Sequence, residues 1–239
     1  AIDLSRFENV KSVTDAVYNP LSSALVISAR ERGINATGGL YMLVSQAAYA
    51  VEKFTGGSIS ADKTEEVYRE ILRDKKNIVL IGMPGCGKTT IGKISADRLH
   101  KEFIDTDDEI IKRINMPIAD YFVKNGEESF RKLESEVIKE ISACRSSVIA
   151  TGGGAVLNPD NIRLLKENGT VIFIDRPLEK LVTTADRPLS SSRELLEKRY
   201  KERYGLYCAA ADVKIDAVNE IEQNVKNIEE VFLNENSCN

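Results

Sequence analysis

From Asn77 onward, apolar residues along the chain fall into two alternating patterns. Short runs rich in Val and Ile are typical of strands buried on both faces of a parallel sheet, and between them apolar residues recur every three or four positions, as on one face of a helix. The predicted strands are Asn77–Ile81, Phe103–Asp105, Ser147–Ala150, Thr170–Asp175 and Val213–Asp216. This alternation predicts an α/β domain with a five-stranded parallel sheet flanked by helices.

Helix positions follow from the same spacing. Phe130 and Ile141 lie on one face of a predicted helix, and a final helix follows Asn219. Asn158 predicts the start of another helix, because its side chain can accept a hydrogen bond from the first turn and Pro159 suits the first helical position.

The first 74 residues carry a weaker pattern. Val13–Tyr18 predicts one strand, followed by a helix ending near Arg32 and a helical run from Gly39. Asp62, with Glu65 three residues later, predicts the start of a further helix that leads into the first strand of the α/β domain. These elements make at most half of a fold, so we expect a small, mainly helical N-terminal unit.

Length and charge narrow the class of protein. A chain of 239 residues suits one full domain and a smaller unit, and we place the boundary near Asp74, giving domains 1–74 and 75–239. Hydrophobic residues at 42% and charged residues at 29% are average for a soluble globular protein. With 33 Lys+Arg against 37 Asp+Glu, the net charge of -4 gives no positive excess to attract nucleic acid.

Cysteine usage and hydropathy exclude further classes. The 4 cysteines are widely spaced and there is 1 histidine, so the sequence predicts neither a zinc site nor a disulfide framework. No apolar run approaches the ~20 residues of a membrane helix, and the start lacks the pattern of a secretory signal. We therefore expect a cytoplasmic protein without membrane contact. Because the first residue is Ala1, a processed product and a piece of a longer protein both stay open.

A phosphate-binding motif follows the first predicted strand of the α/β domain. Gly82–Thr89 (GMPGCGKT) fits GxxxxGK[ST] between a strand and a helix, which is the context that this motif requires. Its glycines let backbone N–H groups surround phosphates, Lys88 neutralises the β- and γ-phosphates, and the Thr89 hydroxyl can ligate Mg²⁺. Cys86 is either a small filler residue or a reactive thiol. The expected nucleotide contacts are Gly82, Gly85, Cys86, Gly87, Lys88, Thr89 and Thr90.

Carboxylates follow the second predicted strand. Because side chains alternate along a strand, Asp105 and Asp107 are predicted to point to the same side at the carboxyl edge of the sheet, beside the phosphate loop. Such a pair suits Mg²⁺ and an acceptor hydroxyl, and the alternative is a solvated helix N-terminus. The chain has no NKxD element for reading guanine.

Four further segments follow in a fixed order. Gly126–Glu134 (GEESFRKLE) predicts the opening of a helix, and Val148–Gly154 (VIATGGG) ends a strand in three glycines, where a ligand can approach the backbone closely. Ala185–Leu189 (ADRPL) precedes a helix that contains Arg203–Tyr207 (RYGLY). With the phosphate loop, these segments resemble shikimate kinase from about Asn77 to the final helix.

The resemblance implies a P-loop kinase that uses ATP and Mg²⁺ to phosphorylate the 3-hydroxyl of shikimate in aromatic amino acid biosynthesis. Asp105 matches the aspartate that holds the magnesium hydration shell, together with Thr89. Asp107 matches the aspartate that binds the shikimate hydroxyls and accepts the attacking proton. Arg187 matches the lid arginine that closes on the phosphoryl group, so the expected catalytic residues are Lys88, Asp107 and Arg187.

The resemblance also implies the contacts to shikimate. Arg131 and Arg203 match the pair that holds its carboxylate, with Glu134 orienting Arg131. Planar guanidinium groups suit this task because they can bind a carboxylate through two hydrogen bonds. The backbone contacts and the apolar wall of the pocket are expected from Gly153, Gly154, Phe122 and Phe130.

Two alternatives and one departure accompany this interpretation. Another small-molecule or nucleoside monophosphate kinase shares the phosphate loop, and a non-catalytic nucleotide-dependent scaffold would keep it too. Many members of the family stack a lid arginine on adenine, but this chain has none between Leu178 and Arg187, and Lys180 supplies only a point charge.

The N-terminal unit has a resemblance of its own. Val13–Pro20 (VTDAVYNP) and Gly38–Ala47 (GGLYMLVSQA) resemble the C-terminal end of shikimate dehydrogenase. The resemblance implies that Tyr18 and Gln46 correspond to substrate contacts and that Gly39 and Met42 correspond to positions beside the nicotinamide. The glycine-rich dinucleotide loop and the rest of that enzyme are missing. We therefore interpret residues 1–74 as a remnant of a Rossmann-type domain without dehydrogenase activity, or else as a purely structural extension.

One helix of this unit is apolar on nearly every face. The pattern from Leu40 to Val51 is typical of an element buried on all sides. The domain that would cover it in shikimate dehydrogenases is missing, so we expect its surface to contact the kinase domain, a second copy of the chain or a separate dehydrogenase piece.

Overall fold

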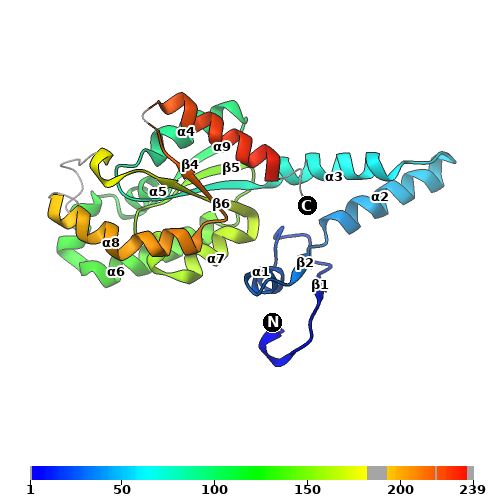
Figure 1. Ribbon diagram of the computed structural model, residues 1–239, viewed down its shortest axis with the longest axis horizontal. Helices are drawn as coiled ribbons and strands as arrows, with labels where there is room; N and C mark the ends of the chain where they lie inside the picture. Colours follow the sequence, from blue (N-terminus) through cyan, green and yellow to red (C-terminus); the bar gives the residue numbers. More distant parts are fainter. Residues whose placement is uncertain (1, 182–192, 219, 236–239) are drawn as a thin grey trace.

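A computed structural model of the protein describes residues 2–181, 193–218 and 220–235. Its centre is a parallel five-stranded sheet with strand order β4-β5-β3-β6-β7 (Figure 1). The predicted sheet is confirmed, and two strands begin one residue earlier than expected. The strands are β3 (Asn77–Ile81), β4 (Glu102–Asp105), β5 (Ser147–Ala150), β6 (Gly169–Asp175) and β7 (Val213–Asp216).

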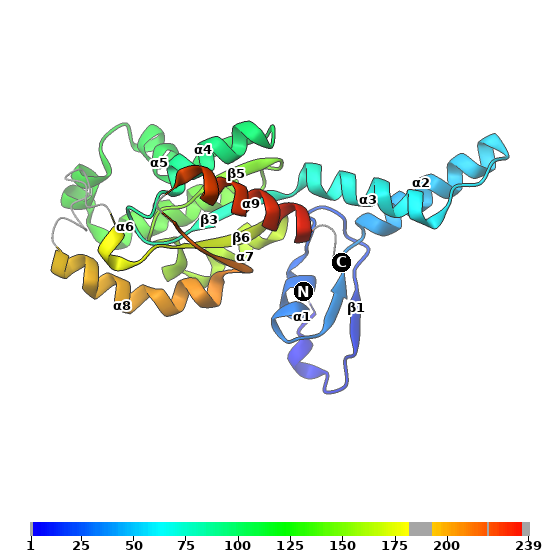
Figure 2. The same cartoon turned by 45° about the horizontal axis from the view of Figure 1, so that its top comes forward.

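Helices cover both faces of this sheet. Helices α4 (Lys88–Arg98) and α9 (Ile221–Glu235) lie on one face, and α6 (Ile118–Ile141), α7 (Pro159–Asn168) and α8 (Arg193–Ala210) lie on the other (Figures 1 and 2). The short α5 (Thr106–Ile114) follows β4 directly, and 3-10 turns occupy Ala155–Leu157 and Leu178–Lys180. Because both faces are covered, β3 and β6 are buried along their whole length, which explains their unbroken apolar runs.

Helix α6 consists of two helical segments that meet at a kink. The first segment, which begins at Ile118, was not predicted, and the second follows Gly126, where the sequence pattern predicted the opening of a helix. Gly126 has φ +76°, a non-helical conformation that favours glycine. Across this kink Phe122 packs on Phe130, with ring centroids 4.4 Å apart.

The N-terminal unit is built on two short parallel strands. β1 (Ser12–Thr14), α1 (Ala24–Glu31) and β2 (Asn35–Thr37) form a βαβ motif. The predicted strand Val13–Tyr18 is wrong beyond Thr14, because the Asp15 carboxylate accepts hydrogen bonds from Val17 N (3.0 Å) and Ser23 Oγ (2.6 Å) and turns the chain. β2 was not predicted, since three residues without apolar alternation give no strand signal.

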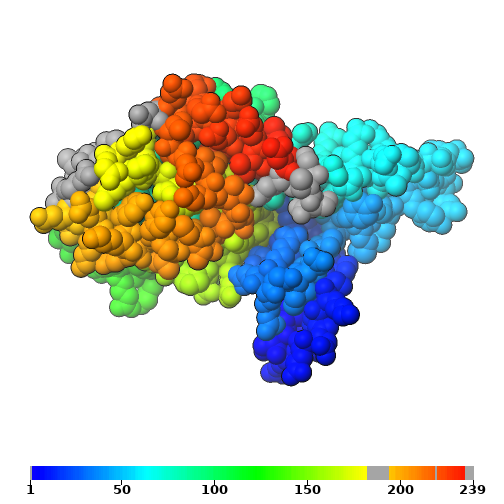
Figure 3. Space-filling model, viewed as in Figure 1, coloured from blue at the N-terminus to red at the C-terminus, as the bar shows by residue number. Residues whose placement is uncertain are grey.

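A helical hairpin projects from the molecule. Helices α2 (Leu40–Thr55) and α3 (Ala61–Lys75) pack against each other and extend away from the sheet (Figures 1 and 3), with Tyr41 edge-on to Tyr68 at 5.3 Å. The helix predicted from Asp62 is confirmed and begins one residue earlier, because the Ser60 hydroxyl accepts the hydrogen bond from Lys63 N (3.2 Å) and caps α3 in place of Asp62.

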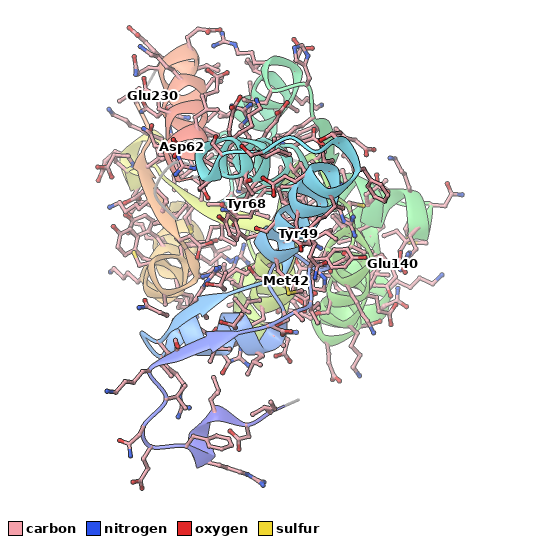
Figure 4. All side chains as sticks on the ribbon, turned by 90° about the vertical axis from the view of Figure 1, so that its right-hand side faces the viewer. Met42, Tyr49, Asp62, Tyr68, Glu140 and Glu230 are labelled. Atoms are coloured by element: carbon pink, nitrogen blue, oxygen red, sulfur yellow. The ribbon has the colours of Figure 1, made fainter. Side chains whose placement is uncertain are left out.

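Most of the apolar surface of α2 is exposed in the single chain. Only Leu40 and Val44 of α2 are buried, whereas Tyr49 is 60% and Phe54 is 89% exposed. Figure 4 looks onto this hairpin, with Met42 and Tyr49 on α2 and Tyr68 on α3. Among the described residues, each helix of the hairpin packs mainly on the other, so most apolar positions of α2 contact water.

The hairpin is attached to the α/β domain near Asp74. The Lys101 ammonium group donates hydrogen bonds to three backbone oxygens at the end of α3, those of Arg73 (3.0 Å), Asp74 (3.1 Å) and Lys76 (3.0 Å). Burial lowers the pKa of Lys101 to about 8. Since these oxygens are otherwise the unpaired carbonyls of a helix end, Lys101 fixes α3 to the following strand.

Within the part of the chain that the structure describes, no helix combines the length and hydropathy needed to cross a bilayer.

Candidate active site

The phosphate-loop motif lies between β3 and α4, at the carboxyl edge of the sheet. Gly82, Gly85 and Gly87 all have positive φ, at +148°, +80° and +104°. A Cβ on Gly82 would stand 2.7 Å from the Ile174 carbonyl oxygen, so no other residue fits there. The loop therefore wraps tightly around the start of α4, where backbone N–H groups and the helix dipole favour phosphate.

Lys88 lies across this loop. Its side chain is 7% exposed, and its ammonium group donates hydrogen bonds to the backbone oxygens of Gly82 (2.9 Å) and Met83 (3.0 Å). Cys86 is fully buried, with Sγ 3.7 Å from the Lys88 ammonium group. A thiol that water cannot reach favours the filler interpretation of Cys86 over the reactive one. Thr90 is exposed in the first turn of α4.

Asp105 joins the phosphate loop to β4. Its Oδ2 accepts a hydrogen bond from Thr89 Oγ1 at 2.8 Å, and its Oδ1 accepts one from Asp107 N at 3.0 Å. Hydroxyl and carboxylate oxygens are the hard ligands that Mg²⁺ prefers, and a nucleotide-bound Mg²⁺ keeps water and phosphate oxygens as its other ligands. The pair of Thr89 and Asp105 therefore fits such an ion, although no cluster of three or more His, Cys, Asp or Glu side chains suited to a metal occurs among the described residues.

The strand alternation predicted for Asp107 is wrong. β4 ends at Asp105, which caps α5, and Asp107 lies in the first helical turn. Asp107 still reaches the carboxyl edge of the sheet, because a Cβ on Gly152 would stand 2.7 Å from Asp107 Oδ1. Thr106 holds the two strand ends together by accepting a hydrogen bond from Gly152 N at 2.8 Å.

Arg131 is oriented by acidic residues of its own helix. One guanidinium nitrogen pairs with Glu134 Oε2 at 2.8 Å and another with Glu127 Oε1 at 3.1 Å. Glu134 is 2% exposed, and burial raises its pKa above the ordinary value while the charge of Arg131 acts in the opposite direction. The Arg131 guanidinium group also meets the glycine turn, since a Cβ on Gly154 would stand 2.0 Å from its Nη1.

Arg203 reaches the same glycine turn from α8. It is 7% exposed and donates a hydrogen bond to the Gly153 oxygen at 2.9 Å. Tyr207, one turn further along α8, donates to the same oxygen at 2.6 Å, and burial raises its pKa above the ordinary value. Sequence reasoning missed Tyr207, although its position four residues after Arg203 places both on one face of the helix.

Aromatic and proline side chains complete the surroundings of this turn. Phe130 is buried against Phe122, and the Arg131 guanidinium lies 5.3 Å from the Phe130 ring centroid. A Cβ on Gly153 would stand 2.8 Å from Pro84 Cδ, so the glycine turn touches the phosphate loop. The structure thus brings two arginines, a carboxylate and an apolar wall next to a phosphate-binding loop.

Two other arginines are candidates for contact with the nucleotide. Arg187 lies outside the described residues. Arg176, which the sequence reasoning did not single out, follows β6, and its Nη1 lies 3.9 Å from where a Cβ of Gly87 would stand. Its position directly after a strand, at the carboxyl edge of the sheet, is the signal that could have identified it.

Comparisons with known proteins show which proteins this chain resembles. A family model described as Shikimate kinase matches residues 84–232. The shikimate kinase of Clostridium botulinum (strain Eklund 17B / Type B) is 44% identical over 164 residues, which covers 67% of this chain and 99% of that protein. The shikimate kinase of Pelotomaculum thermopropionicum is 42% identical over 161 residues, with 64% and 93% covered.

Solved structures give the same result. A shikimate kinase from Acinetobacter baumannii in complex with shikimate superposes with a TM-score of 0.65 at 31% identity, covering 70% of this chain and 98% of that one. The shikimate kinase from Aquifex aeolicus gives a TM-score of 0.60 at 36% identity, covering 68% and 98%.

Proposed function

Because this chain belongs to the shikimate kinase family, we propose that it transfers the γ-phosphoryl group of ATP to the 3-hydroxyl of shikimate at the site formed by the ends of β3, β4 and β5. The observation that carries the assignment of residues is the contact of Gly153 with Pro84. Because of this contact, the glycine turn that Arg131 and Arg203 both approach lies beside the phosphate loop. A small substrate whose carboxylate is bound by the two arginines would therefore have its ring close to the nucleotide.

The phosphate loop holds the nucleotide in this proposal. Backbone N–H groups of residues 82–88 surround the β-phosphate, and Lys88 places its charge beside the β- and γ-phosphates. Thr89 and Asp105 would hold Mg²⁺, which supplies positive charge to the phosphate oxygens when it is bound. Arg176 adds a guanidinium group next to Gly87 on a chain that lacks an arginine between Leu178 and Arg187.

Asp107 and the arginine pair act on the acceptor. The 3-hydroxyl oxygen attacks the γ-phosphorus, the bond from that phosphorus to the bridging oxygen breaks, ADP leaves, and Asp107 takes the hydroxyl proton. Arg131 and Arg203 hold the substrate carboxylate, and Phe122 and Phe130 pack on the ring. The resemblance assigns Arg187 to the closing lid.

Arg131→Ala and Arg203→Ala are each expected to raise the KM for shikimate by about 10- to 150-fold, because each removes a charge-assisted hydrogen bond worth about 1.5–3 kcal/mol. The KM for ATP should stay within about twofold, since neither side chain belongs to the phosphate loop. Steady-state kinetics with each substrate varied at saturation of the other measures both values.

Arg163→Ala is the matched control for this prediction. Arg163 is an exposed arginine on α7 whose guanidinium group pairs with Glu31 at 3.2 Å. Its substitution should change neither KM. If Arg131→Ala or Arg203→Ala raised the KM for ATP and left the KM for shikimate unchanged, the proposed contact of these arginines with shikimate would be wrong.

For residues 1–74 we propose a remnant of a Rossmann-type dehydrogenase domain. The βαβ motif with only two parallel strands, the resemblance of Val13–Pro20 and Gly38–Ala47 and the missing GxGxxG support it. Tyr18 and Met42, which match substrate and nicotinamide positions in the resemblance, are 51% and 44% exposed.

A chain with this remnant is expected to reduce no dehydroshikimate with NADPH, since it lacks the loop that would bind the dinucleotide phosphates. Absorbance of NADPH at 340 nm, followed in a preparation whose kinase turnover has been verified, measures this. A rate of NADPH oxidation that depends on dehydroshikimate and on enzyme concentration would contradict the interpretation.

A further inference from the structure

A third arginine lies on the face of α8 that meets the substrate side of the sheet. Leu196, Arg203 and Tyr207 form the buried stripe of this helix, at 1%, 7% and 1% exposure. Arg199 stands three residues after Leu196 and four before Arg203, so helical spacing puts it on the same stripe, and it is half-buried. Its neighbour Lys198 is exposed on a different face.

Arg199 stands among charges that do not neutralise it. The pKa of Arg199 is lowered, and burial is the largest cause. The positive charges of Arg203 and Arg131 lower it further. The acidic groups that face it are Glu127 and Glu202, and Glu127 already pairs with Arg131 at 3.1 Å. No hydrogen bond or ion pair joins Arg199 to another described residue, in contrast to Arg131 and Arg203.

A half-buried guanidinium group beside two others is costly without an anion. Arg131 and Arg203 bind Glu134 and the Gly153 oxygen, whereas Arg199 has no such partner among the described residues. An anionic ligand at the glycine turn would supply the missing partner, and in the proposed function that ligand is the carboxylate of shikimate.

We propose that Arg199 is a third substrate-recognition cation, which increases the affinity for the shikimate carboxylate together with Arg131 and Arg203. The inference rests on the proposed function. It adds to the expected site a residue that lies one helical turn before Arg203, toward the segment that precedes α8.

Arg199→Gln tests this role, because it keeps the polar side chain and removes the charge. We expect the KM for shikimate to rise about 5- to 20-fold, between the effect of a screened surface charge and that of a buried charge-assisted hydrogen bond. The kcat and the KM for ATP should stay within about twofold, and Arg199→Lys should recover most of the affinity. Lys198→Gln removes the same charge from the next residue and should leave all three constants unchanged.

Shikimate carboxamide, an uncharged analogue, separates recognition of the carboxylate from a structural effect. With the carboxamide, Arg199→Gln and the unmodified enzyme should differ by less than about twofold in KM, because the charge that Arg199 attracts is gone. An equal loss with both acceptors, or a rise in the KM for ATP, would overturn the inference. The inference would also be overturned if Lys198→Gln raised the KM for shikimate as much as Arg199→Gln, because the effect would then come from the net charge of α8 and not from Arg199 itself.

Arg203→Ala in the same assays distinguishes the two levels of the argument. If Arg203→Ala raises the KM for shikimate and Arg199→Gln does not, the proposed role of Arg199 is wrong and the proposed substrate site is still supported. If neither substitution changes that KM, the carboxylate site itself is misplaced.

Discussion

Lys88→Ala is expected to lower kcat by about 100-fold or more, the usual scale for removal of a preorganised electrostatic contact in a phosphoryl-transfer site. Lys88 is the only charged residue from Gly82 to Thr90, so no neighbour in the loop can replace it at the β- and γ-phosphates. Steady-state kcat at saturating ATP and shikimate is the measurement, with circular dichroism melts to compare the folds.

Two further variants make that result specific. Lys88→Met keeps the apolar stem of the buried side chain and should lose as much activity as Lys88→Ala. Lys93→Ala removes an exposed lysine from the same helix and should keep wild-type kcat, because Lys93 faces the Phe103 ring at 5.6 Å and not the loop. Retention of more than about a tenth of kcat in a folded Lys88 variant would contradict the proposed role.

Asp107→Asn should lower kcat by about 100-fold or more while changing the KM for shikimate much less, because the amide keeps the hydrogen bonding but cannot accept the proton. The structure supports this role through the contact of Asp107 Oδ1 with Gly152, at the start of the glycine turn that Arg131 and Arg203 approach. Measuring kcat and KM separately is essential, since only their split distinguishes proton transfer from positioning.

Asp108→Asn is the matched control. Asp108 stands next to Asp107 in the first turn of α5 but is exposed, so its substitution should leave both constants near wild type. If Asp107→Asn raised KM and left kcat unchanged, Asp107 would position the substrate without taking its proton.

The sheet could be predicted because its strands are buried on both faces. β3 and β6 each contain an unbroken apolar run, and short covered strands of this kind leave few alternative positions. The cap at Asn158 was confirmed for a similar reason, since its side chain accepts a hydrogen bond from Asp160 N at 3.1 Å, a contact made within three residues of sequence.

One local feature was missed: strand alternation was extended to Asp107, but the cap supplied by Asp105 starts a helix there. Features that depend on distant contacts could not be predicted from local patterns. The exposure of α2 follows from how little of the chain packs on the hairpin, which no single helix pattern reveals. Tyr207 contacts the glycine turn through a hydrogen bond to the oxygen of Gly153, which is 54 residues away along the chain.

ADP release by the full chain with Mg²⁺, ATP and shikimate, coupled to NADH oxidation, tests the central claim most directly. We expect release that requires shikimate, stops without Mg²⁺ and matches the formation of shikimate 3-phosphate mole for mole. Shikimate-independent release, binding of both ligands without turnover, or a higher kcat/KM with another small-molecule or nucleoside monophosphate acceptor would contradict the account.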